Sequence, residues 1–124
     1  MNVEVIAADE SVTLRPDASG RQFRVLDDFV VLLNIDTRGV VVKVPAGFDT
    51  DLASVPRVLW SWMPPTGRYL RAAIVHDWLY KTATMPRKTA DRIFHALMIR
   101  FGVGPARARL MYWAVRVGGR GAWE

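Results

Sequence analysis

The stretch Phe29–Val44, FVVLLNIDTRGVVVKV, decides the fold of the first half of this sequence. Two apolar runs rich in valine and leucine, a composition that favours β-strands, lie on either side of the polar tetrad Asp36–Gly39. We predict strands at Phe29–Ile35 and Gly39–Val44, joined by a four-residue hairpin connection whose glycine suits a positive φ. Pro45 ends the second strand, because proline has no amide hydrogen to donate to a sheet.

Further strand patterns precede this hairpin. We predict a strand at Gln22–Leu26, separated from Phe29 by a turn at Asp27-Asp28. Weaker strands are predicted at Val3–Ala7 and Val12–Arg15, with a loop at Pro16–Gly20. Short connections join strands that pair antiparallel. The first 45 residues are therefore expected to form a small antiparallel sheet, either a meander or a pair of hairpins.

The apolar period changes in the second half of the chain. Apolar residues recur at helical spacing over Gly67–Tyr80 and Arg87–Phe101, and Gly104-Pro105 opens a third helix that ends near Gly118. Strands followed by helices predict an α+β fold in which the sheet packs on about three helices. We expect one domain over residues 1–124, mainly β over 1–45, a motif loop over 46–66 and helices over 67–118.

Composition excludes several classes of protein. The 124 residues are 51% hydrophobic, which excludes a disordered chain, and the absence of cysteine excludes a disulfide framework, a thiolate zinc site and a cysteine nucleophile. Residues 1–56 carry five cations and nine acids, a net charge of −4, whereas residues 57–124 carry twelve cations and three acids, a net charge of +9. Such asymmetry indicates either a solvated basic face, which we favour, or a polyanionic partner. Nucleic acid is not expected, because no stacking aromatics alternate with the cations on one surface.

The start of the chain shows no secretory signal. Met1–Val5 has neither a basic region nor an apolar core, and no run in the sequence is long enough to span a bilayer. We therefore expect synthesis in the cytoplasm and no transmembrane segment.

A loop rich in short oxygen-bearing side chains links the two halves. It runs GFDTDLASVPR over Gly47–Arg57, and it contains Asp49, Thr50, Asp51 and Ser54. These side chains suit a hard cation, for which we consider Ca²⁺ or Zn²⁺. The alternative is local structure, with Asp51 as a helix N-cap and Ser54 in a turn.

The sharper motif is His76-Asp77-Trp78-Leu79-Tyr80, which falls late in the first predicted helix. His76 and Tyr80 are four residues apart and share a face. If the first two helices pack antiparallel, Asp91 comes close to His76 and can orient its ring as a general base that activates water. Asp77 and Asp91 are the only carboxylates of residues 57–124 besides Glu124.

Two further interpretations of these acids stay open. A buried structural network is one, in which Asp91 forms a salt bridge with Arg68, Arg71 or Arg92. A mixed metal site with His95, four residues after Asp91, is the other and the weaker.

These motifs together resemble a family of uncharacterised proteins of bacteriophages and prophages. The family pattern is F-x-T-D-x-A-S-V-P, then H-D-x-L-Y, then D-R, which correspond here to Phe48–Pro56, His76–Tyr80 and Asp91-Arg92. The resemblance implies a phage origin without supplying a function.

The helical motifs also resemble, more loosely, the active-site helices of phospholipase A2. That resemblance implies that His76 activates water, Asp77 binds calcium, Tyr80 supports the network and Asp91 orients the histidine. Leu79 and Ala90 stand where that family has cysteines, so the disulfides between its helices are absent.

Two hypotheses about function follow from these motifs. The first is a phage-encoded, metal-assisted hydrolase of ester or amide bonds in a cell-envelope substrate, with His76, Asp91 and Tyr80 in the catalytic site. In this first hypothesis, Asp77 together with Asp51 or Asp49 binds the divalent cation. The second is a non-enzymatic virion protein of the tail or neck, which binds other phage structural proteins and whose His–Asp cluster is structural.

Overall fold

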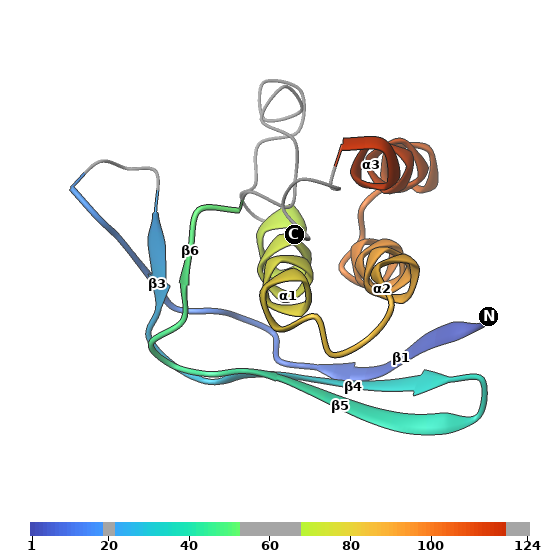
Figure 1. Ribbon diagram of the computed structural model, residues 1–124, viewed down its shortest axis with the longest axis horizontal. Coiled ribbons are helices and arrows are strands. Elements are labelled where there is room, and N and C mark those ends of the chain that lie inside the picture. Colours follow the sequence, from blue (N-terminus) through green and yellow to red (C-terminus); the bar gives the residue numbers. More distant parts are fainter. Residues whose placement is uncertain (19–21, 53–67, 119–124) are drawn as a thin grey trace. The chain divides into compact units, whose positions relative to one another are not determined.

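The computed structural model describes residues 1–18, 22–52 and 68–118, and within these ranges the chain forms strands followed by helices, as Figure 1 shows. This order confirms the predicted α+β fold. The elements in chain order are β1 (Val3–Ala8), β2 (Leu14–Pro16), β3 (Phe23–Val25), β4 (Phe29–Ile35), β5 (Arg38–Val44), β6 (Asp49–Thr50), α1 (Arg68–Thr82), α2 (Arg87–Arg100) and α3 (Pro105–Gly118).

The strands form two sheets, where the sequence indicated one. The first has the strand order β1-β4-β5 and the second the order β2-β3-β6, and every pair is antiparallel. The long strands β4 and β5 pair along their whole length, whereas the three-residue β3 pairs with β2 on one side and β6 on the other. Strand β6 includes Asp49 and Thr50, so part of the predicted motif loop is a strand.

The turn of the β4–β5 hairpin differs from the prediction. Ile35 pairs directly with Arg38, so the connection is the two-residue turn Asp36-Thr37, and Gly39 lies within β5 opposite Asn34. Asp36 and Thr37 have φ values of 49° and 70°. Positive φ at both central positions is the signature of a type I′ turn, a two-residue hairpin turn whose twist matches that of the strands. The predicted four-residue connection with a positive φ at Gly39 is therefore wrong.

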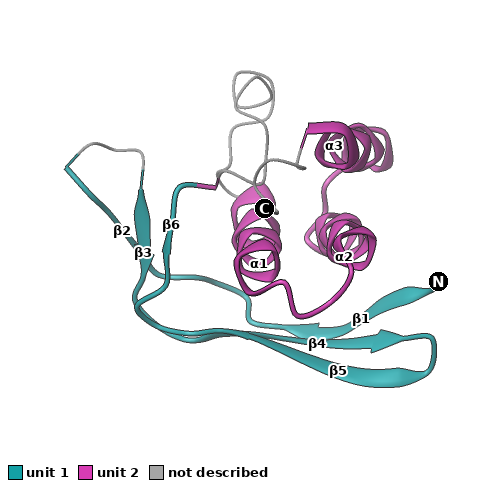
Figure 2. Ribbon diagram, viewed as in Figure 1, with its two compact units in different colours: residues 1–51 teal, residues 52–124 magenta. Residues whose placement is uncertain are grey.

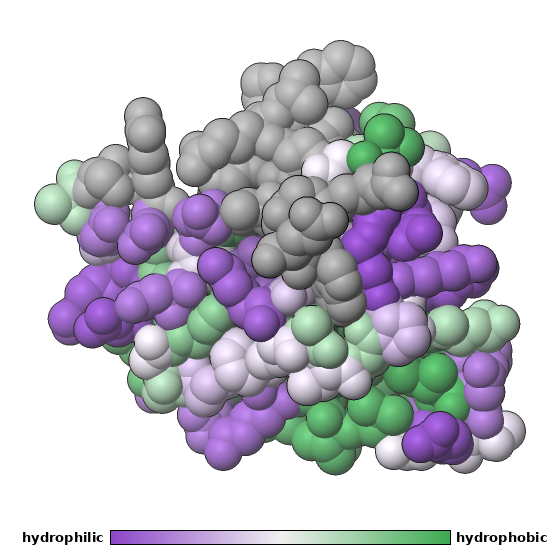
Figure 3. Space-filling model, viewed as in Figure 1, coloured by the Kyte–Doolittle hydropathy of each residue, from purple (hydrophilic) through white to green (hydrophobic). Residues whose placement is uncertain are grey.

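The hairpin has one buried face and one exposed face. Phe29, Val31 and Leu33 of β4 are buried, and Val42 and Val44 of β5 are buried opposite them. The residues between them face outward, and they include the cross-strand pair Leu32 and Val41, which are 39% and 66% exposed. This alternation is the period of two that a half-buried strand requires. Figure 3 shows apolar residues in green in the region of β4 and β5.

The chain divides into two compact units, which Figure 2 shows in different colours. Unit 1 is Met1–Asp51 and contains both sheets, and unit 2 is Leu52–Glu124 and contains the helices. The division falls inside the predicted motif loop. Whether the two units fold as the single domain expected over residues 1–124 remains a prediction.

Helix α1 is buried on all sides. Its residues Ala72–Asp77 are all buried, and six consecutive helical residues cover every face of a helix. Helices α2 and α3 each bury one stripe, which in α3 consists of Ala108, Met111 and Val115. All three helices begin and end within two residues of the sequence prediction. No helix of the described residues is long and apolar enough to cross a membrane.

Candidate functional site: a buried histidine–carboxylate network

The site forms where α1 and α2 meet as an antiparallel pair. The two helices pack against each other, and the short connection between them includes Ala83, which has a left-handed φ of 49°. His76 lies in the second half of α1, whereas Asp91 lies in the first half of α2. An antiparallel pair brings these two positions together, as the sequence predicted.

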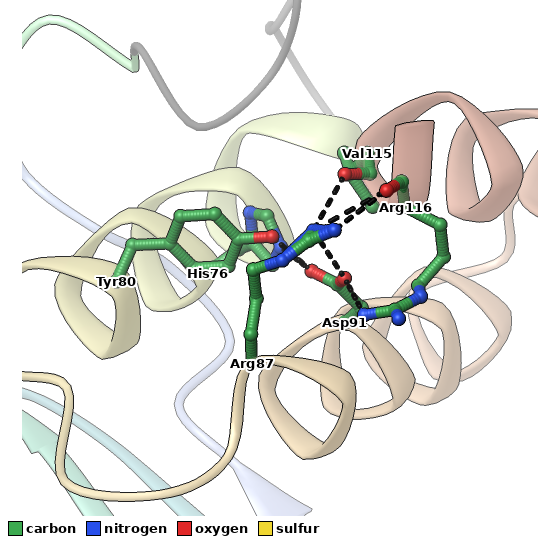
Figure 4. A network of polar contacts seen from close by, with 6 residues as sticks. All are labelled: His76, Tyr80, Arg87, Asp91, Val115 and Arg116. Atoms are coloured by element: carbon green, nitrogen blue, oxygen red, sulfur yellow. Dashed lines mark hydrogen bonds and ion pairs between the residues drawn. The ribbon is translucent and has the colours of Figure 1, made fainter. Parts of the chain in front are cut away.

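Asp91 accepts hydrogen bonds from two side chains of α1, which Figure 4 shows. His76 Nε2 lies 2.6 Å from Asp91 Oδ1, and the Tyr80 hydroxyl donates to the same oxygen at 2.5 Å. The rings of His76 and Tyr80 lie 4.3 Å apart, as expected for residues one helical turn apart. Phe94 of α2 packs against His76, with 4.6 Å between ring centroids. The predicted contact between His76 and Asp91 is confirmed.

Two arginines complete the network, and the sequence did not single them out. Arg116 of α3 donates from Nη1 to Asp91 Oδ2 at 2.9 Å, and Arg87 Nη1 lies 3.5 Å from the same oxygen. Arg87 precedes Asp91 by four residues, a spacing that could have indicated the pair. Nothing in the sequence pattern placed Arg116 beside Asp91, because it comes from a separate helix.

Two of the three arginines that were expected to pair with Asp91, Arg71 and Arg92, lie elsewhere. The Arg71 guanidinium lies 3.8 Å from the ring centroid of Phe101. Arg92 follows Asp91 directly and points to another side of α2, where its Nε is buried without a hydrogen-bond partner in the described part of the chain. The side chain of Arg68 is outside what the structure describes. The salt-bridge alternative thus holds with different arginines from α2 and α3.

Arg87 also binds the end of α3. It donates from Nη2 to the carbonyl oxygen of Arg116 at 2.6 Å, and from Nη1 to the carbonyl oxygens of Arg116 and Val115 at 3.3 and 3.4 Å. The last carbonyls of a helix have no partner within it and carry its negative dipole end, so a guanidinium is a favourable cap. One side chain therefore joins the start of α2 to the end of α3.

Burial and hydrogen bonding set the charge state of the network. His76 and Asp91 have no exposed surface, and Tyr80 is 2% exposed. Burial lowers the pKa of His76 below its usual range, against the opposing effect of the Asp91 carboxylate. Burial alone would raise the pKa of Asp91, but the hydrogen bonds from His76, Tyr80 and Arg116 outweigh it and hold that pKa below its usual value. Burial and the hydrogen bond to Asp91 raise the pKa of Tyr80.

These directions assign the protons at neutral pH. Asp91 is ionised and His76 is neutral, so the imidazole proton resides on Nε2 and is donated to Asp91 Oδ1. Nδ1 of His76 then carries the lone pair. A neutral imidazole oriented by a carboxylate through its other nitrogen is the arrangement of a general base.

The carboxylates expected to bind a cation lie in different parts of the chain. Asp77 is next to His76 on α1 and is 1% exposed. Asp49 of β6 is exposed and accepts two hydrogen bonds from Arg24, at 2.8 and 3.1 Å, which hold its pKa below the usual range. Asp51 is half-buried at the end of unit 1. Over residues 1–18, 22–52 and 68–118 no three His, Asp or Glu side chains form a group that could hold a metal ion.

The remaining motif residues have separate surroundings. Thr50 is buried in β6, and Ser54, the other hydroxyl of the motif, lies outside the described residues. Asp49 borders a pocket of about 250 Å³ on the second sheet, lined by residues of β2, β3 and β6 together with Asp17 and Gln22. His95, considered as a metal ligand with Asp91, instead lies edge-on to Tyr112 of α3 at 5.7 Å. Partial burial, together with Arg109 and Arg92, lowers its pKa.

Fold and site together define a small α+β protein with a charged histidine–carboxylate network among its helices. The chain belongs to the protein family of unknown function DUF1353, whose family model matches residues 23–115. The match runs from β3 to the last buried position of α3, so it includes His76, Tyr80, Arg87 and Asp91.

Two proteins of Sinorhizobium fredii are similar to the chain. The uncharacterized protein y4jT is 37% identical over 82 residues, which are 64% of this chain and 24% of that protein. The uncharacterized protein y4iH is 31% identical over 83 residues, which are 65% of this chain and 35% of that protein. The matches thus span about a quarter and a third of the lengths of these relatives. No solved structure matches the chain.

Proposed function

We propose that the protein is a hydrolase of ester or amide bonds in which His76 is the general base. The observation that carries this proposal is the 2.6 Å contact between His76 Nε2 and Asp91 Oδ1, with the histidine neutral and the carboxylate ionised. Asp91 fixes the tautomer that leaves a lone pair on Nδ1, and it stabilises the imidazolium that forms after proton transfer.

The reaction then follows from this geometry. A water molecule gives a proton to His76 Nδ1 while its oxygen bonds to the carbonyl carbon of the substrate, forming a tetrahedral oxyanion. The oxyanion collapses, the bond to the leaving oxygen or nitrogen breaks, and His76 returns the proton to that leaving atom. Tyr80 and Arg116 hold Asp91 in place throughout through their bonds to its two oxygens. They act as positioning residues, because they reach the reaction through Asp91.

The proposal includes a divalent cation, and Asp77 of unit 2 and Asp51 of unit 1 are tested separately as its carboxylate. Asp49 does not fit this role, because both of its oxygens already bind Arg24. No step above depends on the cation. Its contribution is an experimental variable, to be tested with Ca²⁺ and Zn²⁺.

The motif resemblance extends the proposal to origin and substrate. We propose a phage or prophage origin on the residues Phe48–Pro56, His76–Tyr80 and Asp91-Arg92. A phage hydrolase with this dyad has a natural substrate in the host cell envelope, either membrane lipid or peptidoglycan.

A second function is favoured by a different observation, the complete burial of His76 and Asp91. A substrate must reach a general base, whereas a buried ionic network can serve only to fix one arrangement of helices. In that case the protein is a structural or assembly component of a virion tail or neck, and other phage proteins are its partners.

Activity assays on the purified protein separate the two functions. We would measure hydrolysis of phospholipid vesicles and of peptidoglycan, with Ca²⁺, with Zn²⁺ and with chelator, for the wild type, His76→Gln and His95→Gln. General-base catalysis predicts that His76→Gln loses activity by a factor of about 10² to 10⁴, while His95→Gln, outside the network, retains it. Absence of turnover on both substrates, or turnover unchanged in His76→Gln, would favour the structural role.

A further inference from the structure

Helix α3 carries an apolar ridge on its outer side. This outer ridge consists of Ala106, Leu110, Trp113 and Val117, which are all exposed, the last three by 46%, 58% and 77%. Their spacings of four, three and four residues keep them within about 60° of one another around the helix, since each residue turns it by about 100°. They therefore form one line along most of the length of α3.

The outer ridge is not part of the packing of unit 2. The buried stripe of α3, formed by Ala108, Met111 and Val115, lies about 180° away around the helix. A helix that packs on one side only needs one apolar stripe, and its opposite side is normally polar. The second stripe therefore leaves apolar surface exposed that the packing of α3 on its neighbouring helices does not use.

The charged residues of α3 beside the outer ridge are all cations. Arg107 lies about 100° to one side of Ala106 and Arg109 about 60° to the other, and both are exposed. Helix α3 contains no acidic residue. On the face that Figure 3 shows, green apolar residues and purple polar residues adjoin in the region of α3. Any partner of the ridge must accept apolar side chains between positive charges.

These features favour a lipid surface over a protein. A second copy docking ridge to ridge would bring four arginines together, which is electrostatically unfavourable. The exposed parts of the ridge amount to an area on the order of 300 Å², below the roughly 800 Å² that each partner usually contributes to a stable protein–protein interface. A bilayer surface needs no matching shape, and its anionic headgroups complement arginines beside inserted tryptophan, leucine and valine.

We propose that the outer ridge of α3 binds the protein to anionic phospholipid membranes. Trp113, Leu110 and Val117 enter the boundary between headgroups and acyl chains. Arg107 and Arg109 extend to the lipid phosphates on either side, as long cationic side chains do at such boundaries. This binding is independent of the chemistry proposed for His76, because no residue of the outer ridge takes part in the network.

Vesicle flotation tests this binding directly. The probe is vesicles of diether phosphatidylcholine with 40% diether phosphatidylglycerol, compared with pure diether phosphatidylcholine, since ether lipids cannot be cleaved by an esterase. We expect the wild type to float with the anionic vesicles only and to be released at high salt. Trp113→Ser should weaken the partition by about tenfold, and Arg107→Gln and Arg109→Gln by about fivefold each.

Matched controls come from unit 1. Val41→Ser removes an exposed valine and Arg38→Gln an exposed arginine outside α3, and both should leave binding unchanged. Equal binding to neutral vesicles, or equal weakening by the control variants, would overturn the proposal. The proposal would also be overturned if the wild type did not bind vesicles and formed a dimer in sedimentation analysis that Trp113→Ser converted to a monomer. The partner of the outer ridge would then be a second copy of the chain.

Discussion

Asp91 holds a full set of partners from three helices. One oxygen accepts from His76 and Tyr80 of α1, and the other pairs with Arg116 of α3 and with Arg87, in the first turn of its own helix. A buried carboxylate is costly unless its oxygens are bonded and its charge is compensated. Here the negative charge of Asp91 faces the two positive charges of Arg87 and Arg116, and it compensates them in turn.

Removal of this carboxylate should therefore destabilise the helices strongly. We expect Asp91→Ala to lower the free energy of unfolding by about 3–5 kcal/mol, because three donor side chains lose their acceptor together and Arg87 loses its counter-charge. Urea unfolding followed by circular dichroism measures the change. Asp49→Asn, which breaks an exposed ion pair, is the control and should change stability little. A loss in Asp91→Ala no larger than that of the control would contradict this account.

The network should also make stability depend on pH. The pKa of His76 lies below its ordinary value of about 6.5, so below that pH the unfolded chain binds a proton that the folded chain refuses. Stability should thus fall as the pH decreases from about 6.5 towards the folded pKa, by at most about 1.4 kcal/mol per pH unit. Asp91, whose pKa is also lowered, adds to the loss in the same direction only below about pH 4.

Unfolding midpoints between pH 7.5 and 5 test this dependence. His76→Gln should flatten the curve in this range. His95, whose pKa is lowered as well, contributes in the same direction, so His95→Gln should remove its own share and leave the share of His76. An identical slope in the wild type and in His76→Gln would show that His76 does not titrate in this way.

At the residue scale the sequence predicted pairs within one helix or one helical hairpin. His76 and Tyr80 were found by their spacing of four, and Asp91 by the rarity of acids in residues 57–124 and the antiparallel turn. Arg116 was missed because the rotation of α3 against α2 follows from packing of side chains along both helices, which no local period encodes. Asp49 was grouped with the site on motif spacing, although its strand pairing places it beside Arg24.

At the scale of the elements, the end of α3 is held by a side chain from another helix, α2. Arg87 binds the carbonyls of Val115 and Arg116, so the final turn of α3 is capped from α2. We expect Arg87→Met to increase hydrogen exchange of the amides of Val115–Gly118 by more than about tenfold, while the amides of α1 change less. Lys88→Met, at the exposed neighbouring position, should leave the exchange of both helices unchanged.

Exchange that rises equally in α1 and α3 would indicate global destabilisation instead of a lost cap. Combination with Asp91→Ala separates the two roles of Arg87. If Arg87 caps α3 independently of its ion pair with Asp91, Arg87→Met should still increase hydrogen exchange in α3 when it is introduced into Asp91→Ala.

The elements themselves were more predictable than their connections. Apolar periods of 2 and of 3.6 identified β4, β5 and all three helices within two residues, because burial of one face imposes those periods. The predicted hairpin turn was two residues too long. The pairing of Ile35 with Arg38 leaves a turn of two residues, and both Asp36 and Thr37 take positive φ although they carry side chains. Strands were predicted at Gln22–Leu26 and Val12–Arg15, which overlap β3 and β2, but the second sheet was missed because its third strand, the two-residue β6, is too short to show a period.

On the scale of the whole molecule, the boundary between the acidic and the basic part of the sequence lies at the boundary between the two compact units. Unit 1 contains nine of the twelve acidic residues, whereas unit 2 contains twelve of the seventeen lysines and arginines and only three acids. The buried carboxylate Asp91 thus pairs with arginines of a cationic helical unit, and arginines that do not face it, such as Arg107 and Arg109, lie on the surface of α3. The same excess of cations both stabilises the network and supplies the proposed lipid contact.

The last prediction concerns cooperativity between the units. All five tryptophans lie in residues 52–124, so tryptophan fluorescence follows unit 2, whereas far-ultraviolet circular dichroism follows both. A unit of 51 residues without a disulfide has a small core, so we expect unit 1 to unfold together with unit 2. Leu33→Ala, in the buried face of β4, should cost about 2–5 kcal/mol and lower both midpoints equally. A fluorescence midpoint that stays at the wild-type value while the dichroism transition splits would contradict a single cooperative domain.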